Sequence, residues 1–342
     1  MSLLAVYDGK RYGYAEPDGV IAVPPFLTKL PPWGQERFHD GLAVAYADKA
    51  WGFIERTGTW SIPPAYVSAR PFHAGRAAVA VARKQGRKKK TRWCYVDTDG
   101  AAHGPEDGWF KVTDFGEGRA FVEVEPGDGA VLVDERLEPV GVAPFGGANG
   151  ELDVSALAGR FAEGKAAVRD ANTRKWGYVD RDGAWVIEPR FEVASAFSEG
   201  LACVRTADND VFFVDEAGEV RLRYPIRYLS VSSFSEGLVS MPDAEDSLAR
   251  AYVDHDGEVR IAARRGQGLP FADGRALFEQ GDGKRGYIDR DGKLVIEPTF
   301  HHAEGFRDGY ARVIPDARKP GRYSWIDSSG QLLFAVDWRA ES

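Results

Sequence analysis

The chain has 342 residues, of which 44% are hydrophobic and 12% aromatic, so it is long enough to bury a substantial core. Its formal net charge of -8 at pH 7 argues against a general nucleic-acid binder, because attraction to phosphate needs a dominant positive field. The two cysteines are too few for a disulfide framework, and no apolar run approaches the length of a membrane span. We therefore expect a soluble cytoplasmic protein.

From the N-terminus onward, one short phrase recurs nine times: a hydrophobic residue, a β-branched or small residue, an acid, two variable residues and usually a glycine. It first appears at residues 14–19 and last at 325–330, and successive acids are 35 to 46 residues apart, which is typical of repeat architectures. The nine acids are Glu16, Glu55, Asp97, Asp134, Asp180, Asp215, Asp254, Asp289 and Asp327.

Each acid lies between two short runs of alternating or β-branched residues, as in 177–180 and 184–187, which predicts a β-hairpin. An acid at the first turn position can accept a hydrogen bond from the backbone N–H two residues later, and glycine at the fourth position accepts a positive φ. We therefore predict a type I turn closed by a G1 bulge, with the nine acids acting first as turn residues.

A second phrase, Phe-x-x-Gly followed by an alternating strand, precedes the hairpin in every unit except the first, which keeps a strand near 4–6. It supplies one aromatic residue per unit for a core position beside a turn. The phenylalanines are Phe38, Phe72, Phe115, Phe161, Phe197, Phe234, Phe271 and Phe306.

The strand after the hairpin often reaches a proline, at Pro25, Pro64, Pro189 and Pro298, where we expect it to stop because proline cannot donate to a strand ladder. Each unit is then a three-stranded antiparallel meander that must stack on its neighbours to bury both faces. The predicted fold is an all-β tandem repeat of about nine meanders. It forms a propeller-like ring or an open β-solenoid or two-lobed array, and the irregular middle favours the open or two-lobed form.

The fourth unit departs most from the pattern, because its hairpin at 132–137 lacks both the aromatic residue and the turn glycine. The linker-like segment 145–150 follows it. We place an irregular junction at 141–155, between an N-terminal array of about four units (1–145) and a C-terminal array of about five (155–342).

Residues 175–183 (KWGYVDRDG), 51–55 (WGFIE) and 285–292 (RGYIDRDG), together with the Phe-x-x-Gly and Val-Ile-x-Pro segments, resemble the WG (KWG) repeat family of mostly bacterial proteins. The resemblance covers essentially the whole chain. It implies a β-rich repeat protein that serves as an interaction module, with no enzyme activity, cofactor or catalytic residue. Individual units depart from the pattern where Tyr12, Phe212 and Arg285 replace the tryptophan and Cys94 replaces the glycine.

Two charged sets are candidate binding surfaces. Acids precede the glycine of the Phe-x-x-Gly phrase in seven of eight units, at Asp40, Glu117, Glu163, Glu199, Glu236, Asp273 and Asp308. Stacking would align them into an acidic edge for a basic partner or cations, although solvated turns are the simpler interpretation. Seven cations form a basic loop, predicted to protrude, that could contact an anion, an acidic protein or RNA: Arg83, Lys84, Arg87, Lys88, Lys89, Lys90 and Arg92.

Several of the nine tryptophans recur at equivalent strand positions, which indicates core filling, whereas Trp33 and Trp109 lie outside the hairpin phrase and are candidate exposed aromatics. The pair His301 and His302 beside Glu304 is the one place worth examining for a metal, although no zinc-type spacing occurs. We expect no metal, no cofactor and no catalytic residue, because no nucleophile or phosphate-loop signature is present.

The sequence favours a non-enzymatic protein-binding repeat scaffold, because a rigid repeat can vary its loop residues at little cost in stability. The acidic edge suggests a basic partner, and an inhibitor or immunity protein for a bacterial toxin is one concrete form. The alternative is a carbohydrate-binding protein that uses exposed tryptophans. A hydrolase with paired carboxylates is disfavoured, because turn geometry already explains the repeated acids.

Overall fold

A computed structural model describes residues 3–31, 35–85, 88–141, 160–170, 172–223, 233–243, 245–246, 248–266, 268–315 and 323–335. In these residues the chain forms strands and turns and no α-helix. The described part therefore contains no helix that is long and apolar enough to cross a membrane.

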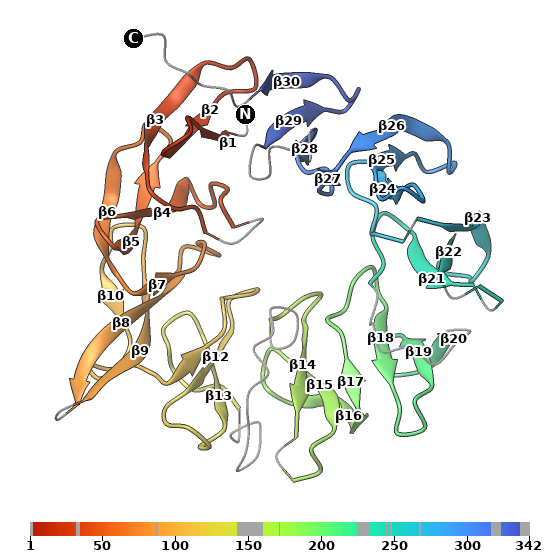
Figure 1. Cartoon of the computed structure of the whole chain (residues 1–342). Helices are drawn as coiled ribbons and strands as arrows, with labels where there is room; N and C mark the ends of the chain where they lie inside the picture. The colour runs from red at the N-terminus through yellow and green to blue at the C-terminus, as the bar shows by residue number, and fades with distance from the viewer. Residues whose placement is uncertain are drawn as a thin grey trace. The chain divides into compact units, whose positions relative to one another are not determined.

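The described strands form nine separate antiparallel sheets, which confirms the predicted all-β array of nine repeats (Figure 1). Two compact units contain them, one made of residues 1–6 and 10–190 and the other of residues 7–9 and 191–342. The predicted junction 141–155 lies, apart from Gly141, outside the described residues.

The first unit holds the first five sheets, apart from the strand-end residues Tyr7 and Phe191. The first and second sheets are β1 (Leu4–Tyr7), β2 (Tyr12–Ala15) and β3 (Ile21–Leu27), then β4 (Leu42–Ala47), β5 (Ala50–Glu55) and β6 (Trp60–Tyr66). The third has four strands, β7 (Ser68–Ala69), β8 (Ala77–Gln85), β9 (Lys88–Val96) and β10 (Ala102–His103). The fourth and fifth are β11 (Lys111–Val112), β12 (Ala120–Glu123) and β13 (Ala130–Val133), then β14 (Lys165–Arg169), β15 (Trp176–Asp180) and β16 (Trp185–Phe191).

The second unit holds the remaining four sheets. They are β17 (Val193–Ala194), β18 (Ala202–Arg205), β19 (Val211–Val214) and β20 (Val220–Arg223), followed by β21 (Val239–Pro242), β22 (Ala249–Val253) and β23 (Val259–Arg265). The last two are β24 (Ala276–Glu279), β25 (Arg285–Ile288) and β26 (Leu294–Phe300), then β27 (His302–Ala303), β28 (Tyr310–Ile314), β29 (Ser324–Asp327) and β30 (Leu332–Ala335). The meander is thus the common unit, and three sheets gain a fourth strand of two residues from the segment before the Phe-x-x-Gly phrase.

The repeated acids are turn residues, as predicted. Asp180 shows the geometry: its Oδ1 accepts hydrogen bonds from the backbone N–H groups of Asp182 and Ala184, both at 2.9 Å, and Gly183 has a φ of +77°. The same pair of bonds to acid+2 and acid+4 forms at Asp97, Asp134, Asp215, Asp254, Asp289 and Asp327. The recurring carboxylates therefore shape hairpin corners.

In six units the phenylalanine of the Phe-x-x-Gly phrase packs edge to face on an aromatic ring of the sheet before it. Phe306 meets Tyr287 of β25 edge to face at 4.8 Å between ring centroids, and the Tyr287 hydroxyl donates to the Glu304 carbonyl at 2.7 Å. Equivalent ring pairs are Tyr14–Phe38, Phe53–Phe72, Tyr95–Phe115, Phe213–Phe234 and Tyr252–Phe271. The predicted core aromatic is confirmed, and it joins consecutive sheets.

The expectation that proline ends the third strand was wrong. β6 continues through Pro64 to Tyr66, and its register against β5 shifts between the pairs Trp51↔Tyr66 and Phe53↔Ile62. This irregularity places the proline where the ladder needs no N–H donor. It also brings the third strand close to Gly52, where an added Cβ would lie 2.5 Å from the Ile62 carbonyl oxygen, so glycine is required there.

Candidate functional site

The longest of the described hairpins carries the basic residues. β8 and β9 pair over nine positions, from Ala77↔Val96 to Gln85↔Lys88, whereas β7 reaches only to Ala80 on one side and Trp109 bridges Trp93 on the other. Residues 81–85 and 88–92 therefore continue past their sheet neighbours as a two-stranded ribbon of about 16 Å, at about 3.3 Å per residue (Figure 1). We call residues 81–92 the cationic ribbon; it is built of strands where the sequence predicted a loop.

The register of the ribbon places like charges opposite each other. Arg83 faces Lys90 and Lys84 faces Lys89 across the ladder, an arrangement that is destabilising in isolation. Arg83 and Lys90 are exposed, and in the described structure neither pairs with a carboxylate. The side chains of Lys84, Lys88 and Lys89, and the whole of Arg87, lie outside the described residues.

Arg92, the seventh residue of the basic set, has a different role. Its side chain is buried, with Nη1 donating to the Val124 carbonyl at 2.7 Å and Nη2 in contact with the Glu125 carboxylate. A buried guanidinium held in this way anchors the base of the ribbon to the neighbouring β12 end. Arg92 is thus structural, and the accessible charge lies further toward the tip.

The seven residues of the predicted acidic edge all have positive φ values, between 50° and 57°. Acid and glycine therefore form a two-residue turn of the I′ kind, which non-glycine residues enter only at a cost. In five places the carboxylate accepts the backbone N–H of the corresponding glycine one repeat later, at 2.7 to 3.0 Å: Asp40–Gly75, Glu117–Gly164, Glu199–Gly237, Glu236–Gly274 and Asp273–Gly309.

These hydrogen bonds tie consecutive repeats together, a role that sequence analysis missed. The signal was present: at a position where φ is positive, glycine or asparagine is the better residue, so a recurring acid needs a separate reason. The third repeat is the exception, since Ala74 with a φ of 52° takes the place of the acid.

The prediction that Trp109 is exposed was wrong. Its side chain is only 5% exposed, and its ring lies 5.7 Å from that of Tyr95. Trp109 exchanges two 2.8 Å backbone hydrogen bonds with Trp93, which draws it into the third sheet beside β9. The other candidate, Trp33, lies outside the described residues, and none of the seven described tryptophans is fully exposed.

Of the histidine pair near Glu304, His302 lies against an arginine, whereas His301 is exposed. His302 Nδ1 lies 3.1 Å from Arg285 Nη1, and Glu304 forms an ion pair with Arg312 at 2.8 Å. Burial, reinforced by Arg285 and Arg312, lowers the pKa of His302, so the imidazole favours its neutral form. Among the described residues, no group of three or more His, Cys, Asp or Glu side chains is arranged to hold a metal ion.

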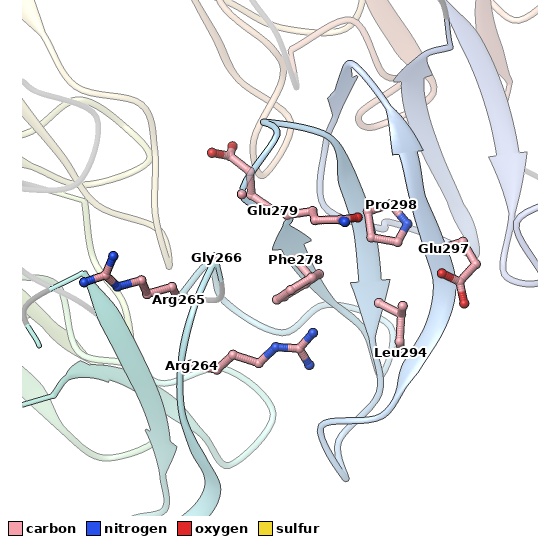
Figure 2. A pocket seen from close by; sticks show the side chains of 10 residues that line it. Arg264, Arg265, Gly266, Phe278, Glu279, Leu294, Glu297 and Pro298 are labelled. Carbon is pink, nitrogen blue, oxygen red and sulfur yellow. The ribbon is translucent and has the colours of Figure 1, made fainter.

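A cavity of about 450 Å³ lies in the second unit between the end of β23 and the sheet β24–β26 (Figure 2). The Arg264 guanidinium stacks 4.0 Å from the centroid of the Phe278 ring, beside Leu294 and Pro298. Arg265 is held by Asp246 at 2.5 Å. The lining combines Arg264 and Arg265 with the acids Glu279 and Glu297 and with apolar side chains, and among its described residues there is no Ser, Thr, Cys or His.

The fold and these surfaces define an all-β repeat scaffold. The family described as "WG containing repeat" matches residues 51–84, 176–209 and 286–314, so the chain contains WG repeats at three positions. The first two segments begin with a Trp-Gly step and the third begins with Gly286; the glycine of this step lies against the third strand, as at Gly52 and Gly286.

The solved structures that match the chain have little sequence in common with it. A structure described as a eukaryotic initiation factor aligns over 97% of this chain and 94% of that one, with a TM-score of 0.58 and 11% identity. The designed protein Ika8 has a TM-score of 0.48 at 12% identity (81% and 91% covered), and the WD40 β-propeller domain of Doa1 has 0.32 at 12% identity (72% and 84% covered). The curated proteins include no match. Similarity at this identity concerns the fold alone.

Proposed function

We propose that this chain is a non-enzymatic protein-binding scaffold whose cationic ribbon contacts an acidic surface of a partner protein. The observation that carries the proposal is the pairing of the exposed cations Arg83 and Lys90 across the ladder, on a ribbon that extends past its neighbours. Opposed cations cost stability in the free protein, and a partner that supplies carboxylates would relieve that cost.

The negative charge of the rest of the chain does not cancel the positive field of the ribbon. With -8 overall and +7 in the ribbon, the remaining residues carry -15. The ribbon extends about 16 Å past its sheet neighbours, about twice the screening length of about 8 Å at physiological ionic strength. The ribbon cations therefore dominate the local field at the tip, while the acidic body repels long polyanions.

The acidic edge supports a basic partner less strongly than the cationic ribbon supports an acidic one. In five of its seven residues one carboxylate oxygen already accepts a backbone hydrogen bond from the next repeat, which accounts for the recurrence of these acids. We therefore assign partner contact to the ribbon. An inhibitor or immunity protein that binds the acidic surface of a bacterial toxin is one concrete form of this function.

Affinity capture from the native host tests the proposal. The bait is the full chain, compared with the double variant Arg83→Glu/Lys90→Glu and with a matched control, Arg136→Glu/Lys293→Glu, which changes the net charge equally at exposed sites outside the ribbon. We expect a protein partner that is retained by the wild type and the control, released by salt, and lost from the ribbon variant. A partner that all three baits retain equally would contradict the proposal.

A further inference from the structure

One edge of the cationic ribbon is open to a further strand. Ala78 and Ala80 of β8 direct their backbone toward β7, since their carbonyls accept the N–H groups of Arg70 at 2.9 Å and Val67 at 2.8 Å. Backbone direction alternates along a strand, so Ala82 and Lys84 present their N–H and C=O groups on the same side. No strand of the described chain pairs with them there.

The segment that pairs with this edge of β8 ends just before the unpaired positions Ala82 and Lys84. Val67 is the last residue that bonds to β8, and Tyr66 already pairs with Trp51 in the preceding sheet. Ala82 is exposed, and so is Val67 at 53%. A strand that continued the line of β7 would meet unpaired backbone groups at Ala82 and Lys84.

We propose that an extended acidic segment of a partner protein adds as a strand along residues 81–85 of β8, in line with β7. The inference rests on the proposed function and specifies how the partner binds. Backbone pairing at Ala82 and Lys84 sets the register, and the exposed cations Arg83 and Lys90 select carboxylates.

The ribbon suits a protein strand better than a nucleic acid. Its sequence, VARKQGRKKKTR over 81–92, has no aromatic side chain on which a base could stack. Its unpaired N–H and C=O groups alternate along β8, and another β-strand matches that spacing directly. Cations on an edge strand also discourage self-pairing, so protection of the edge is the competing explanation.

Fluorescence anisotropy with a labelled ten-residue peptide of alternating Glu and Thr tests the mode of binding. A second peptide of identical charge carries N-methyl groups on alternate residues, which removes the N–H donors from one edge. We expect the first peptide to bind in a salt-dependent manner and the N-methyl peptide to bind about tenfold more weakly, the effect of losing two hydrogen bonds. Arg83→Gln/Lys90→Gln should abolish binding, and Arg136→Gln/Lys293→Gln should not.

The variant Ala82→Pro tests the edge itself. Proline removes the outward N–H of Ala82 and leaves every ribbon charge in place, and an edge position of this kind accepts proline. We expect a loss of peptide affinity of about fivefold or more, with Ala82→Ser as the control that retains wild-type affinity. Unchanged circular dichroism verifies that both variants are folded.

Three outcomes would overturn the inference, each in a different way. Equal affinity for the two peptides would mean contact by charge alone, which leaves the proposed function standing and removes strand addition. No peptide binding, with self-association of Arg83→Gln/Lys90→Gln in light scattering, would mean that the cations only protect the edge, and the proposed function would fail too. Tighter binding of a ten-nucleotide single strand than of the peptide would identify a nucleic-acid surface.

Discussion

Replacing Glu236 with alanine should remove a hydrogen bond between two consecutive repeats and lower the free energy of unfolding. The Glu236 carboxylate accepts the N–H of Gly274 at 3.0 and 3.2 Å through its two oxygens, and the side chain is half-buried. A hydrogen bond to a charged group contributes about 1.5–3 kcal/mol, and partial exposure reduces this to about 1–2 kcal/mol. Alanine keeps the cost of the left-handed φ of 55°, so the whole of that loss should appear in the free energy of unfolding.

Glycine at the same position separates the two contributions. Glu236→Gly also removes the acceptor, but it relieves a left-handed conformation that costs an L-residue about 1–2 kcal/mol. Because glycine also gains entropy in the unfolded chain, we expect Glu236→Gly to be about 1 kcal/mol more stable than Glu236→Ala. Equilibrium urea unfolding of both variants, compared at equal m-value, measures the difference.

The third repeat provides the reverse experiment. Ala74 has the same backbone conformation with a φ of 52°, and no described carboxylate accepts the N–H of Gly118 one repeat later. Ala74→Glu should install the missing hydrogen bond and stabilise the first unit by about 1 kcal/mol. The reasoning would be refuted if Glu236→Ala left the unfolding midpoint unchanged while Ala74→Glu destabilised the chain.

Three further predictions follow from the packing of single residues. Gly52→Ala should destabilise by about 2–4 kcal/mol in thermal unfolding, because its Cβ would lie 2.5 Å from the Ile62 carbonyl oxygen; Cys94→Ala, at the equivalent position without this contact, should cost less than half as much. Burial raises the pKa of the Tyr252 hydroxyl from 10.0 to about 12. The contribution of the buried neutral hydroxyl to the free energy of unfolding is therefore complete below pH 10 and is lost as the pH rises toward 12. Alkaline unfolding should therefore be shallower in Tyr252→Phe, and an unchanged profile would exclude this residue as a cause. Trp109→Ala should cost about 3–5 kcal/mol in urea unfolding, and a change below 1 kcal/mol would be inconsistent with its burial.

The repeat pattern was predictable because its features are local. A carboxylate two residues from the N–H it accepts and a glycine with positive φ act within one turn, so Asp180 and Gly183 could be placed from the sequence alone. The proline rule failed at Pro64 because a register shift between two strands, a non-local feature, determines whether the ladder needs that N–H.

The candidate surfaces were predictable in composition and less so in role. The basic cluster was recognisable, but only the strand register shows Arg83 opposite Lys90 and leaves Ala82 on an open edge. In the sequence Arg92 cannot be told apart from the other cations of the cluster, yet its side chain is buried and donates to the Val124 carbonyl. Trp109 was misassigned for the same reason, since its partner Trp93 is 16 residues away in the chain.

The class of fold, the number of repeats and the chemistry of each corner could be predicted from the sequence, because they depend on residues a few positions apart. Tertiary structure alone decided what the repeated acids do between units, as with Glu236 and Gly274, and which cations stay accessible. Both depend on groups that are far apart in sequence and meet only when sheets stack, and there burial and backbone register select one role among those that a side chain could perform.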